Sequence, residues 1–121
     1  MTTSRPDWAA VAAQAAAEKK GEDTVVLEVG DLLSITDAFV VTSGSNPRQV
    51  RTITEEIERL VKARGGPSPL SIEGLDDARW VLMDYGDFVV HVFLDEARHF
   101  YQLERLWADA EQRSWEVAGA L

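Results

Sequence analysis

The clearest pattern in the chain is an apolar stripe at helical spacing that follows Pro47. Its members lie three or four positions apart and so share one face of a helix: Val50, Ile53, Ile57, Leu60 and Val61. Ser45 or Asn46 can cap the first turn, and the run Gly65-Gly66-Pro67 ends the pattern. These residues predict an amphipathic helix with one buried face.

An alanine-rich segment near the N-terminus predicts a second helix. Ser4 can cap it, with Asp7 three residues later and Pro6 in the first turn, and Gly21 closes it after Lys20. One face of this helix is expected to pack on the rest of the domain: Trp8, Val11, Ala12 and Ala15. Because most of these residues are alanines, the face buries little area.

Short β-branched runs predict strands between and after these helices. Thr24–Val29 and Phe39–Thr42 are two such runs, and the segment 30–37 between them is predicted to be a loop. Leu70–Glu73 predicts a further, shorter strand.

A β-hairpin is predicted around Gly86-Asp87, which separates the strand candidates Trp80–Tyr85 and Phe88–Leu94. A two-residue turn pairs Trp80 with Phe93, Leu82 with His91 and Asp84 with Val89. One side of the hairpin then carries Trp80, Leu82, Asp84, Val89, His91 and Phe93. The other side carries Val81, Met83, Tyr85, Phe88, Val90 and Val92.

The C-terminal part predicts one more helical segment. Asp95 or Glu96 can open it, and it reaches Trp107; the polar tail beyond Asp109 is expected to be helical or frayed. The order of the predicted elements places helices on a mixed β-sheet, hence an α/β fold. The 121 residues suffice for one domain, with a core of about 8–110 and a variable tail, 111–121.

Composition narrows the classes of function. The chain has no cysteine, which excludes disulfides, thiolate metal sites and thiol nucleophiles. The N-terminus lacks the pattern of an export signal, and no apolar run approaches the roughly 18 residues of a membrane span, so we expect a cytoplasmic protein without a membrane partner.

The charge is acidic and unevenly placed. The formal net charge is −9, with −2 in residues 1–66 and −7 in residues 67–121. Binding to nucleic acid depends on Lys and Arg that neutralise phosphates, so this balance argues against broad RNA or DNA contact. A basic protein surface is a better partner, although acidity alone can serve solubility.

Gly44-Ser45 is the first candidate for chemistry, because a strand that ends in Gly-Ser before a helix can receive a phosphate. Nucleotidyltransferases combine such a turn with two metal-binding carboxylates at alternate positions of a nearby strand. Glu56 and Glu58 lie on the predicted helix instead, and Asp84 and Asp87 are separated by a turn. We therefore interpret Gly44-Ser45 as a turn and helix cap, with a nucleotide-binding enzyme as the alternative.

His91 is the second candidate. In the predicted register it lies diagonally from Asp84, and a hydrogen bond between them could fix the imidazole tautomer as in a catalytic relay. With His99, the same two residues could form a metal site. No serine or threonine is aimed at His91, so we interpret it as a structural or interface histidine.

Aromatic residues concentrate in the acidic half of the chain: Trp80, Tyr85, Phe93, Phe100, Tyr101 and Trp107. Rings beside carboxylates suit a protein-binding surface, since the rings supply contact area and the acids select a basic partner. The polar tips of Trp80, Tyr85 and Tyr101 favour the surface, whereas we expect the other three rings in the core.

Several ordered motifs together resemble the ribosomal silencing factor (RsfS), or Iojap, family over roughly residues 8–110. They are Ser34-Ile35-Thr36-Asp37, Gly44-Ser45 with Arg48-Gln49-Val50, Glu73-Gly74, Trp80 with Asp84-Tyr85-Gly86-Asp87, Val90-His91-Val92-Phe93, and the run from Arg98 to Trp107. The resemblance implies a nucleotidyltransferase-like fold that lacks the metal-binding carboxylates and carries out no reaction, so we expect neither enzyme activity nor a cofactor.

The resemblance also implies a function. Family members bind the large ribosomal subunit through its fourteenth large-subunit protein and prevent the small subunit from joining, which lowers translation in starvation or stationary phase. Free members are often homodimers, and organellar relatives act in large-subunit assembly. A large-subunit assembly chaperone without repressor activity is therefore a further alternative.

The family pattern assigns a contact surface to this sequence. By position, the partner-binding residues are expected to be Trp80, Asp84, Tyr85, Tyr101, Leu103 and Glu104. His91 and Arg98 also match motif positions and are expected to support that surface. The tail 111–121 extends beyond the shared pattern.

Overall fold

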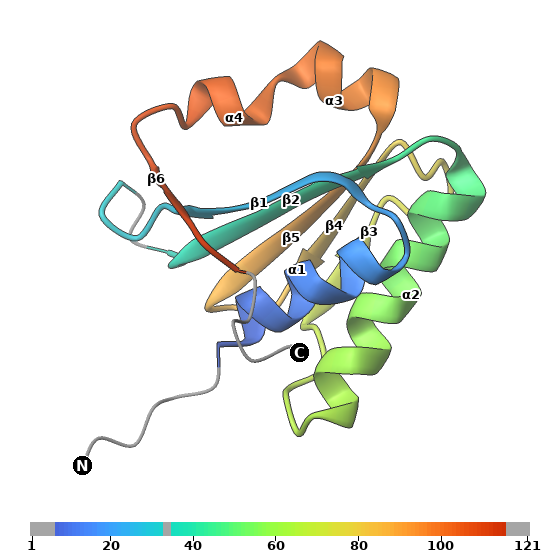
Figure 1. The fold of residues 1–121 in the computed structure, drawn as a ribbon, viewed down its shortest axis with the longest axis horizontal. Helices are drawn as coiled ribbons and strands as arrows, with labels where there is room; N and C mark the ends of the chain where they lie inside the picture. The colour runs from blue at the N-terminus through green and yellow to red at the C-terminus, as the bar shows by residue number, and fades with distance from the viewer. Residues whose placement is uncertain (1–6, 33–34, 116–121) are drawn as a thin grey trace.

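The computed structural model describes residues 7–32 and 35–115, and it places a six-stranded sheet between two helical layers (Figure 1). The strand order across the sheet is β3-β4-β5-β2-β1-β6. Along the chain the elements are α1 (Trp8–Glu18), β1 (Glu22–Glu28), β2 (Ala38–Gly44), α2 (Pro47–Ala63), β3 (Ser71–Glu73), β4 (Trp80–Asp84), β5 (Phe88–Leu94), α3 (Asp95–Tyr101), α4 (Leu103–Leu106) and β6 (Glu111–Arg113). The predicted α/β fold with a mixed sheet is confirmed.

The central strands β2 and β5 pair in parallel, and every other pair is antiparallel. All seven residues of β2 are buried, as expected of a strand covered on both faces. The predicted hairpin register is confirmed, because Trp80 pairs with Phe93, Leu82 with His91, and Asp84 with Val89. Gly86 has a φ of 87°, a left-handed conformation that glycine adopts without steric penalty, so the turn closes in two residues.

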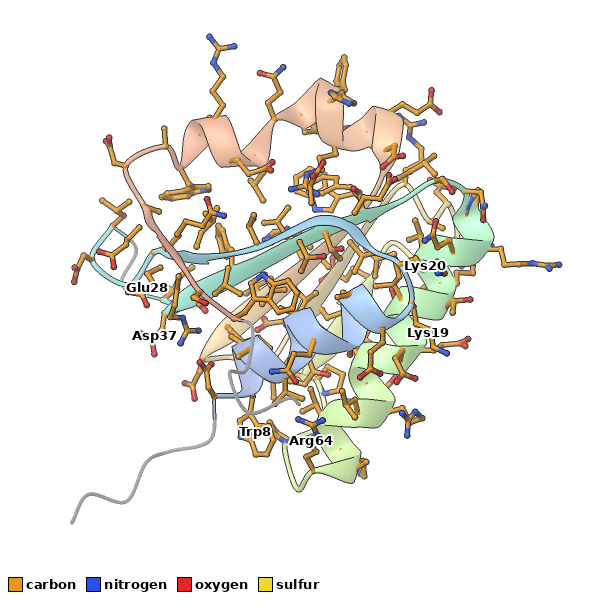
Figure 2. All side chains as sticks on the ribbon, in the orientation of Figure 1. Trp8, Lys19, Lys20, Glu28, Asp37 and Arg64 are labelled. Carbon is orange, nitrogen blue, oxygen red and sulfur yellow. The ribbon has the colours of Figure 1, made fainter. Side chains whose placement is uncertain are left out.

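Helices α1 and α2 cover one face of the sheet and run antiparallel (Figures 1 and 2). Trp8 and Arg64 lie together at one end of the pair, and Lys19 and Lys20 lie at the other (Figure 2). Asn46 caps α2 by accepting a hydrogen bond from the Gln49 amide, as the sequence predicts.

Helix α1 begins and ends differently from the prediction. Asp7 is its N-cap, and the helix ends at Glu18 rather than Lys20, which has a φ of 66°. The predicted cap Ser4 lies outside the described residues. Six alanines of α1 are buried, and their small side chains let the helix lie close to the sheet.

Helices α3 and α4 lie over the opposite face (Figure 1). The predicted helical segment is present but broken at Gln102, whose left-handed conformation (φ 48°, ψ 54°) interrupts the helix. Within α3 and α4 the buried residues are Ala97 and Leu103.

The prediction of a helical or frayed tail is wrong for residues 111–115. Glu111–Arg113 form β6, which pairs antiparallel with Val26–Glu28 of β1. Trp115 donates its indole N–H to the Thr24 carbonyl at 2.9 Å and packs against the core under α1. These contacts to β1 are long-range, so local periodicity does not reveal them.

Candidate partner-binding face

The sheet face under α3 and α4 is covered only in part. A core cluster fills the space between these helices and strands β1, β2 and β5: Leu27, Val29, Phe39, Val41, Phe93, Ala97 and Leu103. On the neighbouring strand β4, Trp80, Leu82 and Asp84 point to the same face and remain half-exposed. We call the part formed by Trp80, Leu82, Asp84, Val89 and Tyr101 the open face.

A row of rings connects the covered part of this sheet face with the open face. Phe39 packs edge-on against His91 with ring centroids 4.7 Å apart, and His91 neighbours Trp80 at 6.0 Å. Trp80 lies 4.8 Å from Tyr101, which meets Phe100 at 5.1 Å. The structure therefore brings together Trp80 and Tyr101, two predicted site residues from separate elements.

His91 fixes the orientation of Trp80. The Trp80 indole N–H donates to His91 Nδ1 at 3.0 Å, which places the imidazole proton on Nε2. Burial lowers the pKa of His91 to about 4, so the ring is neutral at pH 7. The predicted hydrogen bond to Asp84 is not formed: Asp84 Oδ1 instead accepts from the Gly86 amide at 2.8 Å.

The described residues contain no group of three or more His, Asp or Glu side chains that could hold a metal ion. The alternative metal site from Asp84, His91 and His99 is therefore not assembled. His99 is exposed on α3, and His91 is buried in the ring row.

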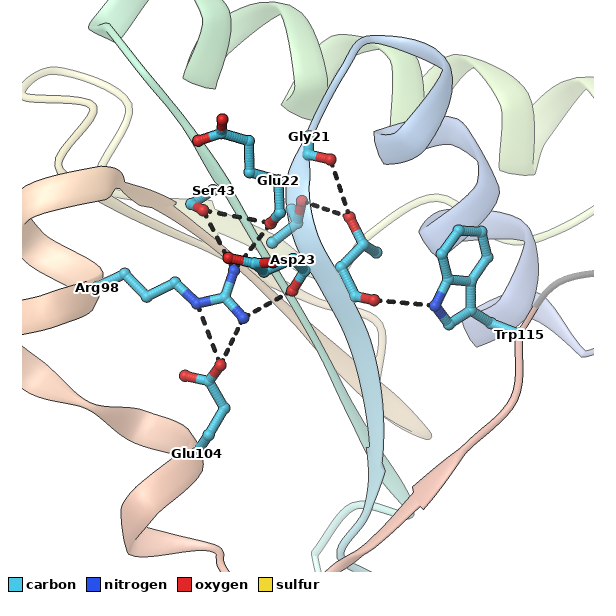
Figure 3. Close-up of polar contacts among 9 residues, drawn as sticks. Gly21, Glu22, Asp23, Ser43, Arg98, Glu104 and Trp115 are labelled. Carbon is cyan, nitrogen blue, oxygen red and sulfur yellow. Dashed lines mark hydrogen bonds and ion pairs between the residues drawn. The ribbon is translucent and has the colours of Figure 1, made fainter.

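Arg98 and Glu104 form the main polar contact between α3, α4 and the sheet (Figure 3). The guanidinium donates to both backbone carbonyls of Glu22 and Asp23, at 2.9 and 2.7 Å, and to Ser43 Oγ at 3.2 Å. Its Nε and Nη2 donate to one oxygen of Glu104. Burial opposes ionisation of Glu104, but the hydrogen bonds and charge of Arg98 outweigh it and lower the pKa of this carboxyl group.

Two expectations about the rings are wrong. Tyr85 is only 7% exposed and lies on the α1–α2 side of the sheet, stacked on Phe88, because it alternates with Asp84 along the strand direction. Phe100, expected in the core, is 77% exposed on α3. The open face thus lacks the Tyr85 ring, and Phe100 extends its apolar edge.

The Gly44-Ser45 turn is occupied by a side chain. Gln49 Oε1 accepts from the Ser45 amide at 2.7 Å and from Ser45 Oγ at 2.9 Å. A Cβ on Gly44 would come within 3.2 Å of the Val50 amide nitrogen, so the close approach of strand and helix favours glycine here. This geometry agrees with a turn and cap, since the groups that would bind a phosphate already have partners.

The acceptors of Arg98 on β1 and β2 could not be found from the sequence. They lie 55 to 76 residues away along the chain, and two of the three are backbone carbonyls, which carry no residue-type signal. Two further residues that were expected to contact the partner are engaged within the molecule. Leu103 is buried in the core cluster under α3 and α4, and the Glu104 carboxylate pairs with Arg98. In the described part of the chain, no helix has the length and apolar character needed to cross a membrane.

Comparison with known proteins shows the family of this chain. The family model described as "Ribosomal silencing factor during starvation" matches residues 2–120. Ribosomal silencing factor RsfS of Bacillus subtilis is 40% identical over 100 residues, which cover 83% of this chain and 84% of that protein. The mouse protein named mitochondrial assembly of ribosomal large subunit protein 1 is 32% identical over 93 residues, 74% of this chain and 40% of its own length.

Solved structures give the same result. A Chromobacterium violaceum crystal structure superposes with a TM-score of 0.80 at 32% identity, covering 94% of this chain and 93% of that one. A crystal structure from Bacillus halodurans superposes with a TM-score of 0.74 at 35% identity, covering 86% of this chain and 93% of that one. From its sequence, its fold and these relatives, the chain belongs to the ribosomal silencing factor family.

Proposed function

We propose that this protein represses translation by binding the large ribosomal subunit and blocking the small subunit from joining. The observation that carries the proposal is the open face, where Trp80 and Tyr101 pack at 4.8 Å beside the half-exposed carboxylate of Asp84. Ordered rings supply binding energy with little loss of entropy, and a carboxylate at their edge favours a basic partner. We expect this role in the cytoplasm under nutrient limitation or in stationary phase.

The partner in this proposal is the basic fourteenth protein of the large subunit. Residues 67–121, which include all residues of the open face, have a formal charge of −7. Attraction between this half of the chain and a basic protein speeds the encounter. Steric occlusion then suffices, and no catalytic turnover is needed. Trp80, Asp84, Tyr101 and Leu82 are the residues that we assign to the contact.

We further propose that the free protein is a homodimer. Phe100 and Leu106 are 77% and 75% exposed on α3 and α4, and Phe100 meets Tyr101 of the open face. Neighbouring exposed apolar side chains favour self-association when no other partner covers them. Dimer and large-subunit contacts would then compete for neighbouring surface.

The test is small-subunit joining to purified large subunits, followed by light scattering as the protein is added. We expect the joining amplitude to fall to near zero at saturation, and an unchanged amplitude would reject the proposal. Tyr101→Ala is expected to weaken binding by about tenfold to a hundredfold. Asp84→Asn keeps the oxygen that accepts from the Gly86 amide but removes the negative charge, so we expect weaker binding. Asp87→Asn, in the exposed turn, is the matched control and should bind like wild type.

A role in large-subunit assembly is the second candidate, supported by the name of the mouse relative. It predicts binding to immature large subunits without inhibition of joining between mature subunits. Binding to both kinds of particle, compared in the same sedimentation experiment, separates the two roles.

A further inference from the structure

The segment Asp95–Leu106, which we call the α3–α4 arm, is not expected to be stable without contacts to the rest of the domain. Its two helices have seven and four residues, well below the roughly 12 at which isolated helices become stable in water. Gln102 separates them in a left-handed conformation that disfavours non-glycine residues. The position of Tyr101, one residue before this break, must therefore come from contacts with the sheet.

Ala97 and Leu103 supply the apolar contacts, and Arg98 supplies the polar ones with all of its guanidinium N–H groups. A guanidinium group carries five N–H bonds, and Arg98 makes five hydrogen bonds. They join three segments: the start of β1, the end of β2 through Ser43, and α4 through Glu104 (Figure 3). The Arg98 side chain is only 10% exposed, so none of this donor capacity is left for a partner.

The backbone of β1 is shaped to receive this guanidinium. The register of β1 against β2 shifts between Glu22 and Val25, and Asp23 within the bulge has a φ of 48°. As a result, the successive carbonyls of Glu22 and Asp23 both accept from Arg98. Lysine has three donors on a single nitrogen and cannot match this planar, forked arrangement.

We propose that Arg98 is a positioning residue for large-subunit binding: it holds the α3–α4 arm so that Tyr101 stays against Trp80, without touching the partner itself. This inference rests on the proposed function. Glu104 then serves as the internal counter-ion of Arg98 rather than as a contact to the ribosome. Without Arg98, the arm samples other positions, and only a fraction of the molecules present a complete open face.

This role has a kinetic signature. When only a fraction of the molecules is competent to bind, the apparent association rate is multiplied by that fraction, while the dissociation rate of the formed complex stays the same. Loss of a direct contact acts mainly on the dissociation rate. Arg98 variants and open-face variants should therefore differ in which rate constant changes.

The experiment measures both rate constants for immobilised large subunits. Arg98→Lys is expected to lower the association rate about tenfold and to leave dissociation within about twofold of wild type. Arg105→Lys is the matched control, since Arg105 is an exposed arginine of the same arm whose guanidinium donates only to the Gln102 side chain among the described residues. Tyr101→Ala is expected to raise the dissociation rate. Unchanged rates in Arg98→Lys, or a faster dissociation alone, would overturn the inference.

Hydrogen exchange of the free protein tests the same inference without a ribosome. Arg98→Lys should speed amide exchange in residues 95–107 and leave β2 and β5 at wild-type protection. Equal protection of the arm in both proteins would refute the positioning role. If wild-type protein fails to bind large subunits, the proposed function falls, while exchange still decides whether Arg98 holds the arm.

Two further variants guard against a loss of folding. Glu104→Gln keeps an acceptor oxygen and should produce a smaller fall in the association rate. The exchanged pair Arg98→Glu with Glu104→Arg restores opposite charges but supplies no donors to the carbonyls of Glu22 and Asp23. We expect no rescue, and full rescue would show that a simple ion pair suffices and that the carbonyl contacts are dispensable.

Discussion

The two faces of the sheet differ most where they share the same strand. On the α1–α2 side, Val81 and Met83 of β4 are fully buried, whereas Leu82 and Asp84 on the other side are half-exposed. Neighbouring residues thus meet a closed core or solvent, because side chains alternate across a strand. The closed face supports stability, and the open face is free for a partner.

The helices explain this difference. Helix α2 has 17 residues with seven of them buried, and α1 adds a layer of buried alanines. The arm opposite buries two residues and leaves Leu82 and Asp84 of β4 half-exposed. Substitutions on the closed face should therefore change unfolding, and substitutions on the open face should change binding.

The largest expected effect tests that separation directly. Ile57 is a fully buried residue of α2, so Ile57→Ala should lower the free energy of unfolding by about 2 to 5 kcal/mol through lost burial and a residual cavity. Leu82→Ala on the open face should lower it by less than about 1 kcal/mol and weaken large-subunit binding. Urea unfolding and co-sedimentation of both variants provide the measurements, and equal loss of stability would contradict the comparison.

Acid should destabilise the protein through the row of rings beside the open face. His91 has a pKa of about 4 when folded against 6.5 as a free side chain, so below pH 6.5 the unfolded chain binds a proton that the folded chain does not. Stability is therefore lost as pH falls from about 6.5 to about 4, by about 3 kcal/mol from this residue.

The His91→Asn variant provides the control for this acid response. Its amide oxygen can still accept from the Trp80 indole, but the side chain does not titrate. Urea unfolding from pH 7 to pH 4 should give a flatter profile for this variant. The same slope in both proteins would assign the acid response to other groups.

Alkaline pH should destabilise the protein through Tyr85, which lies on the closed face. Burial, with a smaller effect from the charge of Glu58, raises the pKa of Tyr85 to about 12. The unfolded chain loses the phenol proton near pH 10, so stability falls as pH rises from about 10 toward 12. We expect the free energy of unfolding to fall by about 1 to 2 kcal/mol, since solvent screens the charge of Glu58. Tyr85→Phe should remove this loss in alkaline unfolding and, at pH 7, change stability little, because the hydroxyl has no hydrogen-bond partner among the described residues.

Local signals predicted the elements that depend on local chemistry. Helix α2 has its cap, its stripe and its terminal glycines within one segment, and the turn at Gly86 fixes the register of β4 and β5. That register already placed Tyr85 beside Val81 and Met83 on the closed face. The prediction that Tyr85 lies on the surface is wrong because alternation along the strand, and not the polar tip of the ring, decides which face the side chain occupies.

The remaining features depend on contacts between distant segments. Arg98 reaches carbonyls of a β-bulge, and β6 forms because the edge of β1 is free to pair. The exposure of Phe100 depends on which face of α3 packs on the sheet, where Ala97 is the buried residue. The family pattern points to Arg98 as a supporting residue, but composition and periodicity contain no information about the backbone carbonyls that accept its hydrogen bonds.

The smallest expected effect concerns the strand that links the two helical layers. Arg113 of β6 donates to both carboxylate oxygens of Asp7, the cap of α1, and lies 3.3 Å from Glu28 of β1. Both side chains of the Arg113–Asp7 pair are partly exposed, so Arg113→Ala should lower the free energy of unfolding by less than about 1 kcal/mol. Asp7→Asn keeps the oxygen that accepts from the Ala10 amide, and a double-mutant cycle isolates the pair. A coupling energy that decreases in 1 M salt identifies a surface ion pair. A coupling energy above about 2 kcal/mol would contradict this and would mean that β6 holds α1 on the sheet as strongly as core packing does.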